Sequence, residues 1–302
     1  MLKRLEKFGS AKGGFTKALY RHSMRSLVLG LSLGAAGMVS ATVGAAPTVA
    51  ADQHTKAAAD ILKNPHRKAA DHKRDAARHP LEVMKFFDIT PTSTVVEVNP
   101  GGMWYSRILG PYLKDHGQYI GLEHHPVSYT YARRYSAGLR AYRSKMAGMK
   151  DIFGPKAIAA HLLQLDSPVK DNSVDTVMVV RAMHNWQRRN FMEAGLAELH
   201  RVLKDGGILG VVQHREAETS DKPVDETVNR GRWRQSELIK VIESHGFKLV
   251  ATSEMNANPK DKDGIRVWML PPILSGPDET KDKMLAIGES DRMTLKFKKV
   301  SQ

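Results

Sequence analysis

Short apolar runs alternate with helical hydrophobic stripes along most of the chain. Runs of apolar and β-branched residues predict buried strands. These runs are residues 94–98, 118–122, 158–165, 174–180, 208–212, 247–252 and 293–297. Between them, apolar side chains recur at the spacing of amphipathic helices. These stripes are residues 104–113, 127–146, 192–203 and 238–242. Strands that alternate with helices indicate βαβ units, so we expect an α/β fold with a mostly parallel sheet.

Two segments flank or interrupt this pattern. Residues 52–90 combine helical spacing with a highly charged stretch, and they predict an N-terminal helical cap. Residues 256–290 contain four prolines and little periodicity, so they are either an ordered loop that covers a site or an insertion. The expected α/β domain occupies residues 91–302, and Asp205-Gly206-Gly207 is expected to end the helix before its fifth strand.

The first 51 residues have the pattern of a secretory signal peptide. Seven Lys and Arg residues and one Glu lie among residues 1–26, before an apolar run over residues 27–46. Small residues at positions 49–51 follow Pro47, which is typical of a cleavage site. We predict cleavage after Ala51 and export to the periplasm or another extracytoplasmic space. The alternatives are an uncleaved membrane anchor and, less favoured, a mitochondrial transit peptide.

Composition narrows the chemistry of the exported protein. The 302 residues include no cysteine, which excludes disulfides, thiol nucleophiles and zinc–thiolate sites. The formal net charge is +14, and residues 1–26 carry +6 of it. The remaining positive charge permits peripheral contact with an anionic membrane surface, but a solubilising surface is the simpler interpretation. No basic stripe with interleaved aromatics favours nucleic acid.

The turn after the first predicted strand has a composition suited to ligand binding. Its sequence is E-V-N-P-G-G-M-W-Y, residues 97–105. A glycine-rich turn between a strand and a helix lets the backbone approach a nucleotide-like ligand. Asn99 and Met103 stand where a dinucleotide fingerprint has glycine, so a turn without a ligand is the alternative.

Further polar residues follow the next three strands. Glu123 ends the second strand, where a carboxylate can accept hydrogen bonds from ribose hydroxyls. Asp166 follows the third strand, where it can receive an exocyclic amine. The stretch R-A-M-H-N-W, residues 181–186, follows the fourth. In open α/β sheets ligands bind beyond the carboxyl ends of the strands, so we expect one site there.

Several stretches of this sequence resemble the seven-stranded S-adenosylmethionine-dependent methyltransferases, and within them an exported branch. The stretches are E-V-N-P-G-G-M-W-Y-S-R-I-L-G-P-Y-L, D-N-S-V-D-T-V-M-V-V-R-A-M-H-N-W, E-L-H-R-V-L-K-D-G-G-I-L-G-V-V-Q-H-R, G-F-K-L-V and G-E-S-D-R-M-T-L-K-F. The resemblance implies a Rossmann-like, doubly wound sheet with an antiparallel last strand. It implies S-adenosylmethionine as cofactor and methyl transfer as activity. It also implies that Glu123 faces the ribose and Asp166 the adenine. The cofactor-binding residues so assigned are Glu97, Asn99, Gly101, Gly102, Glu123 and Asp166.

Candidates for catalysis and substrate binding lie after the fourth and fifth strands. His184 is the first candidate for a general base or substrate anchor, and His214 the second, because histidine titrates near neutral pH. Asn185 would hold a substrate amine, or it caps a helix that begins near Gln187. Tyr105 and Trp186 would wall a small-molecule pocket. For each, a purely structural role is the alternative.

Other classes of protein fit the sequence less well. A non-catalytic extracytoplasmic binding protein with the same fold remains open, since the cofactor is made in the cytoplasm. A nicotinamide-dependent oxidoreductase is disfavoured because G-x-G-x-x-G is absent. We expect no metal site, because no H-E-x-x-H pattern accompanies the scattered histidines.

Overall fold

The computed structural model describes residues 60–124, 129–164, 166–262 and 264–301. All of these residues belong to the second of the two units into which the chain divides. The predicted signal peptide therefore lies outside the described residues. Among the described helices, none has the length and apolar character that a membrane span requires.

Seven strands form the main sheet of the second unit, in the order β3-β2-β1-β4-β5-β8-β7. Their bounds are β1 Thr94–Val98, β2 Gln118–Glu123, β3 Ile158–His161, β4 Val174–Val180, β5 Leu203–Glu216, β7 Phe247–Ser253 and β8 Arg292–Lys299. The pairs among β1 to β5 are parallel, and β8 runs antiparallel to both β5 and β7. A two-residue strand β6, Trp233–Arg234, pairs with the end of β5. This topology confirms the predicted fold, including its antiparallel last strand.

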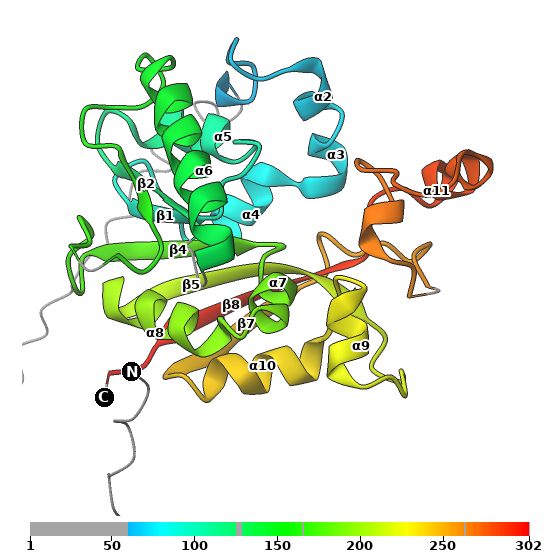
Figure 1. The fold of residues 1–302 in the computed structure, drawn as a ribbon. Helices are drawn as coiled ribbons and strands as arrows, with labels where there is room; N and C mark the ends of the chain where they lie inside the picture. The colour runs from blue at the N-terminus through cyan, green and yellow to red at the C-terminus, as the bar shows by residue number, and fades with distance from the viewer. Residues whose placement is uncertain (1–59, 125–128, 165, 263, 302) are drawn as a thin grey trace, which may run out of the picture. The chain divides into compact units, whose positions relative to one another are not determined.

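Helices cover both faces of the sheet (Figure 1). The helices are α2 Ala69–His72, α3 Asp75–Arg78, α4 Pro80–Phe86, α5 Ser106–Leu113, α6 Tyr129–Ala147, α7 Met183–Arg188, α8 Met192–Val202, α9 Val224–Asn229, α10 Gln235–Glu243 and α11 Lys281–Ile287, with 3-10 turns η1 Val267–Met269 and η2 Asp278–Thr280. Apolar residues of α4, α5 and α6 form a core on one face. Those of α7, α8, α9 and α10 form the larger core on the other. Both faces of the central strands are therefore buried, as a parallel sheet requires.

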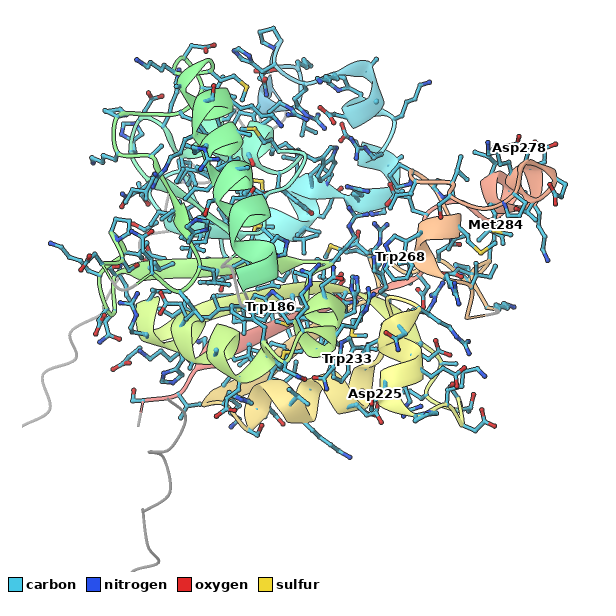
Figure 2. All side chains as sticks on the ribbon, viewed as in Figure 1. Trp186, Asp225, Trp233, Trp268, Asp278 and Met284 are labelled. Atoms are coloured by element: carbon cyan, nitrogen blue, oxygen red, sulfur yellow. The ribbon has the colours of Figure 1, made fainter. Side chains whose placement is uncertain are left out.

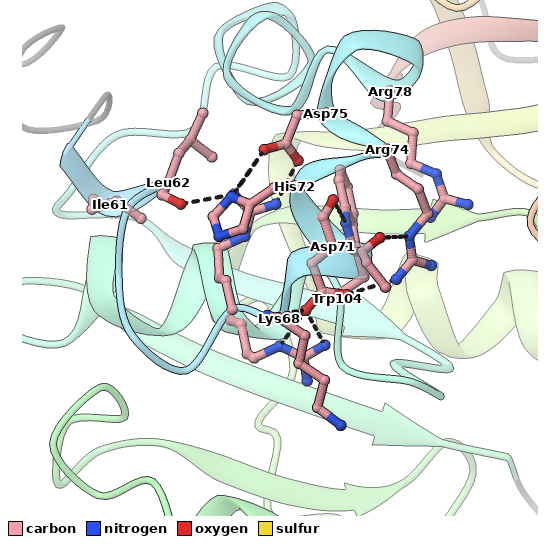
Figure 3. A network of polar contacts seen from close by, with 12 residues as sticks. Ile61, Leu62, Lys68, Asp71, His72, Arg74, Asp75, Arg78 and Trp104 are labelled. Atoms are coloured by element: carbon pink, nitrogen blue, oxygen red, sulfur yellow. Dashed lines mark hydrogen bonds and ion pairs between the residues drawn. The ribbon is translucent and has the colours of Figure 1, made fainter.

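The N-terminal helical segment is fastened to the sheet domain by packing and ion pairs. Phe87, after α4, lies over the sheet where a Cβ on Gly210 would approach its ring to 2.4 Å, so β5 needs glycine there. The carboxylate of Asp71 accepts hydrogen bonds from Arg74 at 2.6 Å and Arg107 at 2.7 Å (Figure 3). The indole of Trp104 donates to the Asp71 carbonyl at 3.0 Å. The segment is therefore held directly against the first turn after β1.

Three local differences from the sequence-based expectations stand out. β3 ends at His161 rather than Leu165, and Leu163 has a positive φ of 61° that the strand conformation does not allow. β5 begins at Leu203, immediately after α8, so Asp205-Gly206-Gly207 lie within the strand beside a register shift against β4. Residues 256–290, expected to have little periodicity, contain the helix α11.

Candidate functional site

The turn after β1 is built from unusual backbone conformations. Asn99, Gly101 and Met103 have φ values of 53°, 51° and 63°, a region that favours glycine. A Cβ added to Gly102 would meet no atom within 4 Å. Both side-chain polar atoms of Asn99 are buried without a hydrogen-bond partner. Because an unpaired buried amide is unfavourable, Asn99 is suited to receiving a polar ligand.

Glu97 is buried behind this turn rather than exposed in it. Its carboxylate accepts hydrogen bonds from the hydroxyls of Ser106 and Tyr119, each at 2.7 Å. Tyr142 joins the network through Tyr119 at 2.5 Å, in the space left by Gly121. Burial raises the pKa of Glu97 to about 7 in spite of these hydrogen bonds. The network ties Glu97 to α5 and α6, and a direct contact with cofactor stays a prediction.

The two other predicted acidic residues lie in different surroundings. Glu123 ends β2 and is partly buried, and burial raises its pKa while hydrogen bonds from the backbone N–H groups of His124 and Gly101 lower it. Glu123 thus lies next to the turn after β1. Asp166 is exposed in the loop after β3, where Gln164 donates to its backbone carbonyl at 3.2 Å. The role of Asp166 toward the adenine stays a prediction.

A pocket of about 240 Å³ opens at the carboxyl ends of β1, β4 and β5. Polar groups that follow the strands and residues from segment 267–273 both line it. The lining residues are Asn99, His124, Val180, Arg181, Ala182, His184, Asn185, His214, Val267, Trp268, Pro271, Pro272 and Ile273. The structure therefore brings Asn99, His184, Asn185 and His214 together in one pocket, and their roles stay predictions. Part of the 256–290 segment lies over this site.

The hydrogen-bond pattern around His184 fixes which ring nitrogen carries the proton. Gln213 Nε2 lies 3.0 Å from the carbonyl of Gly231 and 3.2 Å from His184 Nδ1. The carbonyl can only accept, so the Gln213 amide nitrogen must face it and donate. The same nitrogen then makes His184 Nδ1 an acceptor, and the proton of the neutral ring resides on Nε2.

His184 is neutral in the folded protein. It is almost fully buried, and this burial lowers its pKa to about 4. The Trp268 ring packs edge-on against it, with centroids 6.0 Å apart. A neutral imidazole with its proton on Nε2 donates a hydrogen bond from that nitrogen. Of the two roles predicted for His184, this arrangement favours the substrate anchor over the general base.

His214 lies beside His184, with ring centroids 5.7 Å apart. Its Nδ1 is 2.5 Å from the hydroxyl of Ser290, immediately before β8. Burial and the nearby Arg181 hold the pKa of His214 well below its ordinary value. A neutral imidazole has one nitrogen that can accept a proton, but the lowered pKa makes His214 a weaker base than an ordinary histidine.

Arg181 lines the pocket, although the sequence analysis gave it no role of its own within the stretch 181–186. It directly follows β4 with a positive φ of 58°, and its N–H donates to the Val212 carbonyl at 2.7 Å. Burial, together with the guanidiniums of Arg78 and Arg292, lowers the pKa of Arg181 to about 9. The only available signal was its place in R-A-M-H-N-W, the stretch that carries His184.

The remaining predicted substrate residues occupy distinct positions. Asn185 lines the pocket, but it lies inside α7 rather than capping a helix that begins near Gln187. Tyr105 borders a small void of about 10 Å³ with Arg78, Arg181 and Arg292. Trp186 is 2% exposed and packs against Phe191 in the core (Figure 2). A substrate contact for Trp186 stays a prediction, whereas its packing role is visible. Among the described residues, no three His, Asp or Glu side chains are grouped to hold a metal ion.

The sheet order, the glycine-containing turn after β1 and the acid after β2 define a class I methyltransferase fold with a nucleoside-cofactor edge. Residues 96–211 match the family described as a methyltransferase domain. This part of the chain therefore matches a methyltransferase domain, and the sheet order is that of the class I methyltransferase fold. A methyltransferase domain is an enzymatic domain, and the cofactor it implies is S-adenosylmethionine.

Solved structures with a similar fold share little sequence with this chain. A SAM-dependent methyltransferase from Aquifex aeolicus has 16% identity and a TM-score of 0.48, covering 80% of this chain and 98% of its own. A putative methyltransferase from Bacillus halodurans has 17% identity and a TM-score of 0.47, covering 74% of this chain and 100% of its own. A putative sarcosine dimethylglycine methyltransferase from Galdieria sulphuraria has 13% identity and a TM-score of 0.46, covering 78% and 90%. No curated protein matches the sequence.

The residues around the β1 turn suit this cofactor. The unpaired amide of Asn99 offers a donor and an acceptor, and Glu123 presents a carboxylate of raised pKa beside the Gly101 N–H. The open side of Gly102 leaves room for a ligand to approach the backbone. Asn99, Gly101, Gly102 and Glu123 are therefore the residues that would hold S-adenosylmethionine.

Proposed function

We propose that the protein transfers the methyl group of S-adenosylmethionine to a small molecule bound over β4 and β5. The observation that supports this is the pocket itself, in which Asn99 of the cofactor turn and the group Arg181, His184 and His214 line one space. A pocket of about 240 Å³ has the scale of a small ligand rather than of a macromolecular surface.

The chain's own residues supply positioning and a proton acceptor. The bound cofactor supplies an electrophilic methyl group on a sulfonium sulfur. The substrate is oriented by the His184 Nε2–H and the Arg181 guanidinium, and Trp268 with Pro271 and Pro272 excludes water from that side. The nucleophilic atom loses its proton to His214, whose neutral ring is held by Ser290.

The proposal extends to where the reaction takes place. The basic block, the apolar run and the small-residue exit of residues 1–51 support export with cleavage after Ala51. Intact mass of the protein recovered from the extracytoplasmic fraction tests this part. A mass that begins at Asp52 is expected, and a mass that retains Met1 would contradict cleavage.

A labelled-methyl assay tests the activity. Full-length protein is incubated with methyl-labelled S-adenosylmethionine and separated small-molecule and macromolecular extracts of the extracytoplasmic fraction. Label is expected in the small-molecule products, and it should be lost with Gly101→Val because valine cannot easily adopt the positive φ of that turn. Label confined to protein or nucleic acid, or equal label with the variant, would overturn the proposal.

A further inference from the structure

We infer that the substrate carries an oxyanion, such as a carboxylate, and that Arg181 is the residue that binds it. This inference rests on the proposed function, because it identifies the chemical class of the molecule methylated in that pocket. Three features of the described residues support it: the donors in the pocket, the excess of positive charge behind it, and the position of Arg181 after β4, away from Glu123.

The described lining of the pocket offers hydrogen-bond donors and no carboxylate. Arg181 contributes a guanidinium, which matches the planar geometry of a carboxylate. His184 contributes its Nε2–H, since Gln213 occupies Nδ1. Asn99 and Asn185 add amides. A cationic group, or one that only donates hydrogen bonds, would face a positive charge and further donors here. An oxyanion would instead accept hydrogen bonds from several of these groups.

The charges behind the pocket are not balanced by protein carboxylates. Arg78 donates to both oxygens of Glu289, at 2.9 and 3.0 Å, and Arg292 donates to the same carboxylate at 2.6 Å. Among the charged side chains that act most strongly on Arg181, Glu289 is the carboxylate and Arg78 and Arg292 are cations that share it, whereas Arg74 is paired with Asp71. Buried nitrogens of Arg78 and Arg292 also lack partners. An incoming anion would relieve this excess of positive charge.

The place of Arg181 in the sheet separates it from Glu123, one of the residues suited to the cofactor. Glu123 ends β2 and Asn99 follows β1. Arg181 follows β4, and its backbone N–H donates a hydrogen bond to the Val212 carbonyl of β5. In the order β2-β1-β4-β5, Arg181 therefore follows the strand on the far side of β1 from Glu123, and its side chain shares the pocket with Asn99. S-adenosylmethionine has a carboxylate of its own, which competes with the substrate oxyanion as a partner of Arg181. The experiment must therefore distinguish these two partners.

Gln213 acts as a positioning residue for this site. It is fully buried on β5, and its amide is oriented by the Gly231 carbonyl. It thereby keeps His184 as a donor toward the pocket. His184→Gln retains an N–H donor, and His184→Phe removes it, so the pair separates donation from ring packing.

Ligand-observed NMR titrations of the full-length protein with benzoate and benzamide test the inference. The two probes share a shape and differ in charge. Each is measured with and without saturating S-adenosylhomocysteine, for wild type, Arg181→Gln, Arg181→Lys, His184→Gln and His184→Phe. Arg140→Gln, at an exposed position on α6, is the matched control. Melting curves verify that each variant folds.

Benzoate is expected to bind wild type at least tenfold more tightly than benzamide, because charge-assisted hydrogen bonds contribute about 1.5–3 kcal/mol, roughly 10- to 100-fold in affinity. Arg181→Gln should abolish the preference, Arg181→Lys should keep part of it, and Arg140→Gln should keep all of it. His184→Gln should bind benzoate more tightly than His184→Phe.

Two results overturn the inference while leaving the proposed function standing. In the first, the protein binds S-adenosylhomocysteine but binds benzoate no more tightly than benzamide, or binds neither probe. The other is loss of S-adenosylhomocysteine affinity in Arg181→Gln as large as the loss of benzoate affinity, which would assign Arg181 to the cofactor carboxylate. Wild type that binds benzoate but no S-adenosylhomocysteine would support the anion site and contradict the proposed function instead.

Discussion

Acidification should destabilise the folded protein through His184, and replacing His184 with glutamine should remove that effect. The pKa of His184 falls from the ordinary 6.5 to about 4 on folding because the ring is buried. A group with a depressed folded-state pKa contributes stability that is complete above its unfolded value. That stability is lost as the pH falls toward the folded value, so the window is pH 6.5 to 4.

The size of the effect follows from the pKa shift. One unit corresponds to about 1.4 kcal/mol, so the full contribution is about 3 kcal/mol, and roughly 2 kcal/mol of it is lost by pH 5. Glu97 acts in the opposite direction over the same range, because its pKa is raised to about 7. Wild-type stability alone would therefore mix two opposing contributions. The difference between wild type and His184→Gln isolates the histidine.

Urea unfolding at pH 7.5 and pH 5 provides the measurement, followed by circular dichroism. As the pH falls from 7.5 to 5, wild type should lose about 2 kcal/mol of its free energy of unfolding relative to His184→Gln. His116→Gln, at an exposed position before β2, should follow the wild type. Parallel curves for wild type and His184→Gln would refute the neutral, buried His184 and with it the assignment of Nε2 as a donor.

Three further variants test other parts of the site and core. Gly101→Val should weaken S-adenosylmethionine binding at least tenfold by calorimetry while the circular dichroism spectrum is retained, because φ of 51° is strained for valine; Gly138→Ala, where an added Cβ meets no atom within 4 Å, is the control. Glu97→Gln should gain up to about 3 kcal/mol relative to wild type as the pH rises from 5 to 9, since the stability from a raised pKa is lost as the pH passes 7; a constant difference in urea unfolding would contradict the raised pKa. Trp186→Ala should lower the free energy of unfolding by about 3–5 kcal/mol, and a loss below 1 kcal/mol would show that the ring does not fill the core.

The pattern of apolar runs was sufficient to predict the sheet and the edge that carries the site. β1 and β4 match their predicted bounds, and β2, β7 and β8 differ by one or two residues. Because each strand's end was located, Asn99, His184 and His214 could be assigned to one edge. The end of β3 was predicted too late because Leu162 and Leu163 continue the apolar run while the backbone already turns.

The polar network around the pocket could not be predicted in the same way. A single arginine after a strand is indistinguishable in sequence from a solvated charge, so Arg181 gave no signal by itself. Its importance arises from Arg78 and Arg292, which are distant in sequence and adjacent in space. Gln213 directly follows the apolar run 208–212 of β5, and its partner Gly231 comes 18 residues later through a tertiary contact. Hydrogen bonds of this kind depend on the folded backbone rather than on periodicity.

Equilibrium binding of S-adenosylmethionine to the full-length protein, measured by calorimetry, tests the central claim most directly. One site per chain is expected, with S-adenosylhomocysteine competing for it and with no heat from NAD. The turn of Asn99, Gly101 and Gly102 beside Glu123 provides the physical basis for that result. A folded protein that takes up neither S-adenosylmethionine nor S-adenosylhomocysteine would contradict the account and would favour a binding protein that retains only the fold.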